Sequence, residues 1–173
     1  MQDIKYPIGT YDLKTIPTEA QVMTWLDELE RFPGELRTCV AGLIDEQLDT
    51  PYRRAGWTIR QIVHHLADSH INAYVRLKLA LTENSPQTIA YAQDAWAQLP
   101  DSQLPLAPSI IILENLHLRL ITLLRNVEAS ELQRQFLHPE LGSIRVDSTI
   151  GLYAWHGKHH CAHIAGLRKR EMW

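Results

Sequence analysis

Two stretches in the first half of the chain repeat apolar residues at helical spacing, and each begins with a capping box. In this motif a Ser or Thr and a Gln or Glu three residues later satisfy backbone N–H groups at a helix start. Thr18 with Gln21 and Thr58 with Gln61 fit the motif. The second stretch predicts a long helix that ends at about Thr82. Its apolar positions are Ile59, Ile62, Val63, Leu66, Ala73, Leu77 and Ala80.

The other helix signals lie around a Pro-Gly pair and in the second half of the chain. The pair at 33–34 predicts a kink or a break in the first helix, because proline removes a backbone hydrogen bond. A third helix is predicted to begin at Ser109. A fourth is predicted to begin at Asp147 or Ser148, whose side chains suit an N-cap, and to run to about Arg170.

The segments between these helices differ in length and character. Residues 83–108 hold four prolines and form the longest irregular segment, which predicts a lid or a pocket wall. Residues 135–147 predict a short β-hairpin that turns at Pro139 to Gly142. Four amphipathic helices with one long and two shorter connections predict an all-α fold, a four-helix bundle with a short hairpin before the last helix. We expect one domain over residues 1–173.

Composition narrows the function classes without naming one. The 17 Lys and Arg residues against 20 Asp and Glu residues leave a net charge of −3, so no basic excess indicates a nucleic-acid groove. Cys39 and Cys161 form no disulfide framework and no metal-type Cys-x-x-Cys spacing. The first residues lack a signal-peptide pattern, and the longest strongly apolar run, 110–113, is too short to span a bilayer. We therefore expect a cytoplasmic protein that binds neither membrane nor nucleic acid.

Histidine is the residue type that carries candidate chemistry. Seven of the nine histidines lie in two windows, His64, His65 and His70 in one and His156, His159, His160 and His163 in the other. Residues four apart share a helix face, so the second window offers two His-x-x-x-His pairs. Such a pair and a third histidine from a facing helix leave one open position on a bound cation, the arrangement of a catalytic zinc site. The alternative is a histidine-rich surface that titrates near neutral pH.

Helix periodicity narrows the choice of ligands without completing it. His160 lies on a mostly apolar stripe that should face the core, while the pattern does not exclude His159. In the earlier window His65 lies on a polar stripe with one aliphatic member, which suits the lining of a site. His64 shares its face with polar residues and is predicted to be more exposed.

Three strings in the sequence resemble the DinB-like superfamily. They are GWTIRQIVHHLADSH at 56–70, YAWHGKHHCAHI at 153–164 and the lead-in YPIG at 6–9. The closer resemblance is to the YfiT branch of metal-dependent hydrolases, which is related to bacillithiol transferases, and it extends along nearly the whole chain. It implies a four-helix bundle and a homodimer.

The resemblance also implies which histidines bind metal. The family's first ligand, a His before Leu in the second helix, falls on His65. The other two fall on the His-x-x-x-His pair that begins the HGKHH string, His156 and His160. We expect zinc, because imidazole-only sites suit it, although nickel, manganese and iron bind the same donors.

Two reactions on a small-molecule substrate fit these ligands. In hydrolysis the metal supplies hydroxide near neutral pH. In thiol transfer a low-molecular-weight thiol is the co-substrate and loses its proton on the metal before it attacks a small electrophilic substrate. A non-catalytic metal- or ligand-binding bundle of the stress response is the alternative. The catalytic acid or base is not identified by the sequence, and Arg76 with Asn72 are candidates either to meet an anionic substrate or to pair on the surface.

Overall fold

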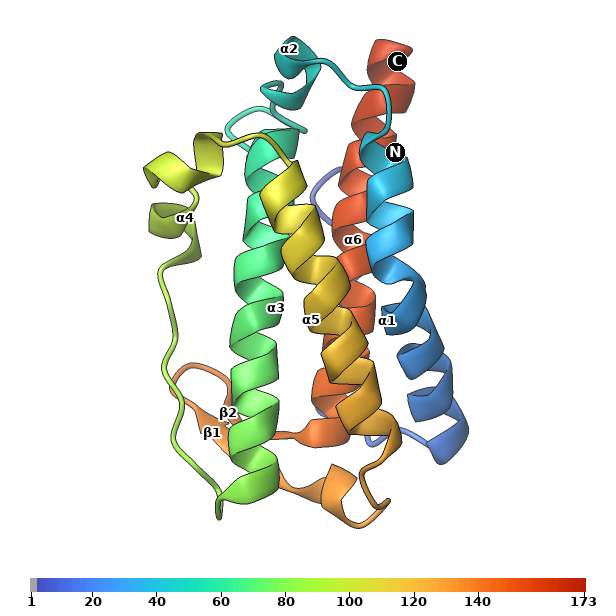
Figure 1. The fold of residues 1–173 in the computed structure, drawn as a ribbon, viewed down its shortest axis with the longest axis vertical. Coiled ribbons are helices and arrows are strands. Elements are labelled where there is room, and N and C mark those ends of the chain that lie inside the picture. The colour runs from blue at the N-terminus through green and yellow to red at the C-terminus, as the bar shows by residue number, and fades with distance from the viewer. Residues whose placement is uncertain (1–2) are drawn as a thin grey trace.

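The computed structural model describes residues 3–173 and consists of four long helices packed side by side (Figure 1). Helix α1 packs against α5 and α6, and helix α3 packs against the same two, so the helices close a four-membered bundle. The long helices are α1 (Glu19–Val40), α3 (Ile59–Thr82), α5 (Ala107–Arg125) and α6 (Val146–Glu171). The fold is therefore the expected helical bundle.

The connections hold the short elements. An antiparallel hairpin precedes the last helix, as predicted. Its strands are β1 (Gln135–His138) and β2 (Gly142–Arg145). Helix α2 (Asp45–Leu48) lies before α3, and helix α4 (Gln93–Trp96) lies between α3 and α5. Two 3₁₀ turns, Pro100–Gln103 and Glu131–Gln133, complete the connections.

Both predicted capping boxes are present. The Thr18 hydroxyl accepts a hydrogen bond from the Gln21 backbone N–H at 3.3 Å, and the Gln21 side chain accepts one from the Thr18 backbone N–H at 2.8 Å. Thr58 and Gln61 make the same two bonds at 3.1 and 3.0 Å. Helix α3 ends at Thr82, where the apolar pattern predicted its end.

Helix α1 continues through Pro33, so of the predicted kink or break the break is wrong. Pro33 is itself buried, and its neighbours Phe32 and Leu36 are buried in the core. Packing of this face on α5 and α6 outweighs the lost backbone hydrogen bond.

The starts of the last two long helices also differ from the prediction. Helix α5 begins at Ala107, and the Ser109 hydroxyl lies 2.7 Å from the His64 ring instead of capping the helix. Helix α6 begins at Val146 with no side-chain cap. Asp147 lies inside the first turn and accepts hydrogen bonds from Arg145. The Asp147 carboxylate, which was predicted to cap the helix, thus forms a salt bridge with Arg145 instead.

The segment predicted to be irregular at 83–108 contains α4 and a 3₁₀ turn. It is attached to the hairpin, because the Leu137 N–H donates to Pro86 O and the Thr88 N–H donates to Leu137 O, each at 2.9 Å. Figure 1 shows the segment rising along the outer side of α3, from the end of that helix to α4. This attachment holds it in place beside the bundle.

A layer of histidines divides the core into two apolar clusters. One cluster, near the hairpin, includes Leu77 and Ile150, and the other, near α2, includes Ile62 and Ile164. Between them lie two completely buried histidines, His70 of α3 and His117 of α5, and the histidines of α6. Polar groups in the centre of a bundle need partners, so these buried histidines are the candidate functional residues.

Helix α5 is long and apolar enough to span a membrane by length and composition, and it is the one helix within residues 3–173 that is. The apolar run 110–113 lies within this helix and is by itself too short to span a bilayer. In the structure α5 is a core helix that packs against α1 and α3, with Leu113 and Leu120 buried. A core helix passes the same length and composition test, so the signal is weak evidence for a membrane.

Replacing Gly157 by alanine is expected to destabilise the protein by about 1–3 kcal/mol, because the added carbon meets a packed ring. A Cβ at this position would lie 2.6 Å from the Phe32 ring, which stacks on His70. Urea denaturation checks the change. The matched control is Gly166→Ala on the same helix, where the nearest atom is a flexible arginine tip at 3.4 Å. That variant should gain about 0.5–1 kcal/mol from helix propensity, and equal effects at both sites would contradict this packing.

Candidate metal centre

Three histidines from two helices converge in the middle of the bundle. His65 of α3 faces His156 and His160 of α6, and one ring nitrogen of each lies within 4.8 Å of the others. The Nε2 atoms of His65 and His156 are 3.2 Å apart. Two nitrogens bound to a tetrahedral zinc at 2.0–2.1 Å would be about 3.3 Å apart. The structure therefore brings together the three residues expected from the sequence, at a spacing that suits one cation.

Burial keeps these three rings in the form that binds metal. It lowers the pKa of His65 to about 4. It also lowers the pKa values of His156 and His160 well below the usual histidine value, with neighbouring histidines adding to the effect. A metal ligand must be a neutral imidazole, and these rings are neutral at pH 7 without a metal.

A chain of hydrogen bonds sets which nitrogen of His160 is available. His163 Nε2 lies 3.1 Å from the carbonyl oxygen of Lys5, so this nitrogen carries the proton and donates it. His163 Nδ1 is then an acceptor, and His160 Nδ1 lies 3.4 Å from it. With the proton of His160 on Nδ1, its Nε2 keeps a free lone pair. The N-terminal lead-in thus orients a candidate ligand through His163.

Replacing His163 by phenylalanine is expected to weaken zinc binding about 10- to 100-fold, the usual cost of losing a group that orients a ligand. Phenylalanine keeps the ring that stacks on Tyr52 at 4.0 Å and removes both hydrogen bonds. The control is His159→Phe, which keeps the stacking on Trp155 and should leave zinc affinity unchanged. Competition with a zinc chelator measures both. Weaker zinc binding in the His159 variant alone would show that His159, and not His163, supports the metal site.

The second ring nitrogen of His156 lies in the core next to His70. This nitrogen, Nδ1, is buried and unpaired among the described residues. Next to it, at a ring-centroid distance of 5.6 Å, lies His70, whose Nε2 is also buried and unpaired. His117 donates to Leu29 O at 2.7 Å and accepts from His70 at 2.8 Å, which leaves His70 Nε2 as an acceptor. If His156 used Nε2 to bind a cation, its Nδ1–H would be a donor, complementary to this acceptor.

The three histidines line a pocket of about 430 Å³. Trp57 packs against His65 at a centroid distance of 4.5 Å and forms one wall with Tyr52. Trp155 and the segment 83–108, through Gln93 and Asp94, form other parts of the lining. The long connection is therefore a pocket wall, as its length suggested, and the volume suits a small organic molecule.

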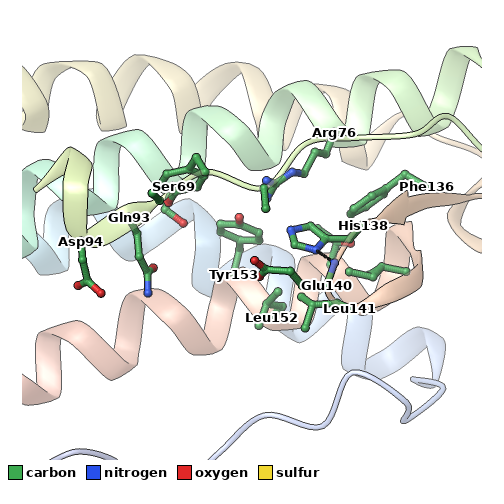
Figure 2. A pocket seen from close by; sticks show the side chains of 15 residues that line it. Ser69, Arg76, Gln93, Asp94, Phe136, His138, Glu140, Leu141, Leu152 and Tyr153 are labelled. Atoms are coloured by element: carbon green, nitrogen blue, oxygen red, sulfur yellow. Dashed lines mark hydrogen bonds between the residues drawn. The ribbon is translucent and has the colours of Figure 1, made fainter.

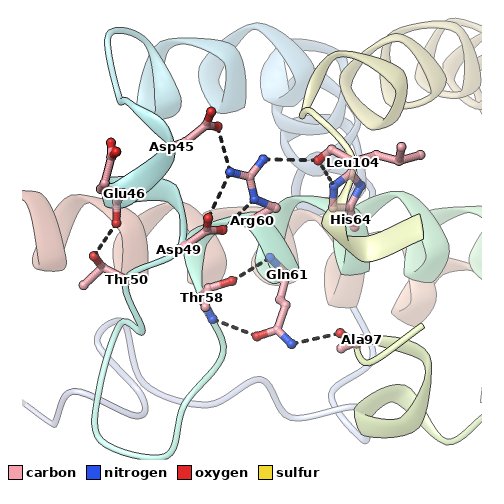
Figure 3. Close-up of polar contacts among 10 residues, drawn as sticks. All are labelled: Asp45, Glu46, Asp49, Thr50, Thr58, Arg60, Gln61, His64, Ala97 and Leu104. Atoms are coloured by element: carbon pink, nitrogen blue, oxygen red, sulfur yellow. Dashed lines mark hydrogen bonds and ion pairs between the residues drawn. The ribbon is translucent and has the colours of Figure 1, made fainter. Parts of the chain in front are cut away.

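His64 is buried, which corrects the expectation that it is exposed (Figure 3). Its Nδ1 lies 2.7 Å from the Ser109 hydroxyl and its Nε2 lies 3.0 Å from Leu104 O. On the same face Arg60 is buried in hydrogen bonds to Asp45 and Asp49. Helix periodicity identified this polar face correctly, but the segments before and after α3 cover it.

Two residues outside the histidine cluster also have clear positions. Cys161 is partly buried and lies beside Cys39 of α1, and the hydrogen bond between them raises the pKa of the Cys161 thiol. This agrees with a packing role. Arg76, expected at the surface or near substrate, is buried with only 9% of its surface exposed. Tyr153, which the sequence analysis did not single out, lies one helical turn before His156 and within ring contact of it.

A helical bundle that brings three neutral histidines together in the lining of one pocket defines a helical protein with a candidate metal site. A family model described as the DinB superfamily matches residues 28–164, and the chain belongs to this superfamily.

Similar proteins have the same length and related names. A relative from Bacillus cereus (strain 03BB102) and one from Bacillus thuringiensis subsp. konkukian (strain 97-27) are each 50% identical over all 173 residues and over their whole length. Both are named "Putative metal-dependent hydrolase". A solved structure of YfiT from Bacillus subtilis, described as "a probable metal-dependent hydrolase with an unusual four-helix bundle topology", is 43% identical, covers 99% of each chain and has a TM-score of 0.96.

Proposed function

We propose that the protein is a zinc-dependent hydrolase of small molecules, with His65, His156 and His160 as the metal ligands. The observation that carries the proposal is the 3.2 Å separation of the His65 and His156 Nε2 atoms, with His160 beside them. The homologues named as metal-dependent hydrolases support the reaction class. The comparisons leave the metal and the substrate open.

The three histidines fit zinc in ligand type, in number and in protonation state. Imidazole nitrogen is a preferred zinc ligand, and three protein ligands leave a fourth position open for water or substrate. All three rings are neutral, so no proton must leave before binding at pH 7. The unpaired His156 Nδ1 would gain its proton as a donor once Nε2 binds metal. A bound zinc ion would lower the pKa of a coordinated water to about 7 and polarise a substrate carbonyl.

The surrounding residues supply shape and proton transfer. Trp57, Tyr52 and Trp155 form aromatic walls against which a substrate would pack. Two lining groups that are able to accept a proton lie beside the three ligands, the Asp94 carboxylate and the neutral His159 ring. Burial lowers the pKa of His159 to about 4, so it is unprotonated at pH 7. The free ring can accept a proton in a hydrolytic step, but its low pKa makes it a weaker general base than a histidine with a pKa near the operating pH.

Thiol transfer is the second candidate, and the room beside the histidines favours it. A neighbouring cavity of about 420 Å³ shares Gln93 and Asp94 with the histidine pocket. Together they can hold a thiol and an electrophile at once. In that reaction a thiolate sulfur forms a bond to the electrophilic carbon, the leaving group departs with its electron pair, and the thiol proton passes to a base.

A cobalt-substituted protein distinguishes the two reactions. Under the hydrolase proposal the cobalt form cleaves an ester or amide without added thiol, and a small thiol inhibits it. Under thiol transfer, 2-mercaptoethanol gives an intense near-ultraviolet sulfur-to-cobalt band and is required for consumption of an alkylating substrate. Thiol-dependent turnover with no hydrolysis would overturn the hydrolase proposal, and absence of both reactions would favour a non-catalytic binding protein.

We also infer that the protein is a homodimer, as the family resemblance implies. Helix α5 exposes apolar side chains that a second copy would cover, among them Ile111, Ile112 and Leu118. Multi-angle light scattering is expected to give twice the 19.9 kDa chain mass. A monomer at micromolar concentration would reject the dimer.

A further inference from the structure

Arg76 is a buried cation without an anionic partner. Only 9% of its surface is exposed, and its one described hydrogen bond to the backbone runs from the guanidinium to Ile89 O at 2.7 Å. No carboxylate in residues 3–173 lies within ion-pair distance of it, whereas the similarly buried Arg60 pairs with Asp45 and Asp49. Burying an unpaired charge is costly, and a guanidinium has five donors to satisfy. Arg76 therefore has donors that no carboxylate of the described residues pairs with.

The Arg76 side chain lines the cavity of about 420 Å³ next to the histidine pocket (Figure 2). Figure 2 shows Arg76, His138 and Tyr153 pointing toward the same space. The Tyr153 hydroxyl interacts with Ser69 and Arg76, but burial is the larger effect and raises its pKa, so it remains a donor. The Arg76 guanidinium of α3 and the neutral Tyr153 hydroxyl of α6 therefore face the same cavity as hydrogen-bond donors.

His138 adds a third donor to this cavity. Its Nδ1 accepts a hydrogen bond from the Glu140 backbone N–H at 3.2 Å, which places the ring proton on Nε2. Burial and the nearby Arg76 lower its pKa, so the ring is neutral at pH 7. The carboxylates that also line the cavity, Glu140 and Asp94, belong to exposed residues. The inner part of the cavity thus presents hydrogen-bond donors.

We propose that this cavity binds the anionic head of an organic substrate, a carboxylate or a phosphate, through Arg76, Tyr153 and His138. The planar guanidinium fork suits either anion. Apolar side chains line the rest of the cavity and fit a hydrocarbon body, namely Phe136, Ile144, Leu141 and Leu152.

The cavity is placed to present the rest of such a substrate to the histidines. Tyr153 precedes His156 by three residues, about 4.5 Å along the helix axis, and the two rings are 5.8 Å apart between centroids. Gln93 and Asp94 line both spaces. A molecule held by its anionic head at Arg76 would extend along α6 toward His156. This last step rests on the proposed metal-dependent function, while anion binding itself does not.

Calorimetric titration of the full chain tests anion binding, with and without one equivalent of zinc. The probes are 4-phenylbutyrate, its neutral analogue 4-phenylbutanol, and phenyl phosphate. We expect one of the anions to bind the wild type at least about tenfold more tightly than the alcohol, as suits a charge-assisted hydrogen bond. The tighter of the two anions identifies the head group.

The variants assign the binding to Arg76. Arg76→Met should weaken anion binding at least about tenfold and leave the alcohol unaffected, while Arg76→Lys should retain part of the binding. The control is Arg119→Met, an exposed arginine over the Tyr74 ring, which should not change it. Should Arg76→Met fail to fold, Glu140→Gln provides the test, because loss of a carboxylate at the cavity should strengthen anion binding.

The outcomes separate this inference from the metal proposal. Anion binding that needs Arg76 but not zinc supports the cavity, even if zinc fails to bind the histidines. Equal affinity for acid and alcohol overturns it. So does anion binding that needs zinc and is the same in Arg76→Met, because the anion would then be bound by the metal.

Discussion

Alanine at any one of His65, His156 or His160 is expected to weaken zinc binding by about a hundredfold to a thousandfold. Structural zinc sites gain about 10–16 kcal/mol from four ligands, so one ligand contributes roughly 2.5–4 kcal/mol. The three nitrogens lie within 4.8 Å of one another, and among the described residues no fourth side chain joins this group. Competition against a chromogenic chelator measures the affinity.

The control for this prediction is the neighbouring buried histidine. His64→Gln changes a residue adjacent to His65 whose ring nitrogens lie against Ser109 and Leu104 O instead of the pocket. It should keep zinc affinity within about threefold of wild type, even if it lowers stability. Full zinc occupancy in any of the three alanine variants would remove that residue from the site.

The metal-free protein is expected to lose stability as the pH falls from about 6.5 to 4, and His117 is one of the groups responsible. Burial lowers its pKa to about 4, against the usual 6.5 in the unfolded chain. Below pH 6.5 the unfolded chain therefore binds a proton that the folded chain does not, which favours unfolding. The free energy of unfolding is therefore highest above pH 6.5. It falls toward pH 4, by up to roughly 3 kcal/mol for His117.

Urea midpoints at pH 7 and pH 4.5 measure this dependence. His117→Leu should show a shallower pH dependence than wild type, whatever its stability at pH 7, because it removes one titrating group. His117 contacts His70, Phe32 and the Leu29 carbonyl, and Glu30 and Glu114 line the pocket beside it. Burial is the main cause of its lowered pKa. Equal pH dependence in the variant and the wild type would show that His117 does not titrate in this range.

The fold was largely predictable because its signals are local. Both capping boxes, the end of α3 at Thr82 and the hairpin turn depend on residues a few positions apart. The errors have two different causes. Pro33 stays within a helix because it and the side chains around it are buried against other helices, which no pattern along α1 shows. Asp147 pairs with Arg145, two residues before it, because a carboxylate near a helix start can form a local salt bridge as well as a cap.

The candidate site was predictable only in part. Spacing identified His-x-x-x-His pairs on α6, but family resemblance was needed to choose His156 and His160 over the neighbouring pair. The role of His163 was missed because its partner, the Lys5 carbonyl, lies 158 residues away in sequence. The burial of Arg76 was missed because periodicity shows which residues share a face and not which connection covers it.

Anomalous diffraction at the zinc edge, from crystals of the zinc-loaded full chain, tests the central claim most directly. We predict one strong peak about 2.0–2.1 Å from the ring nitrogens of His65, His156 and His160, with a fourth ligand that is not a protein side chain. A peak between His159 and His163, closure of the site by a fourth side chain, or no peak at all would contradict it.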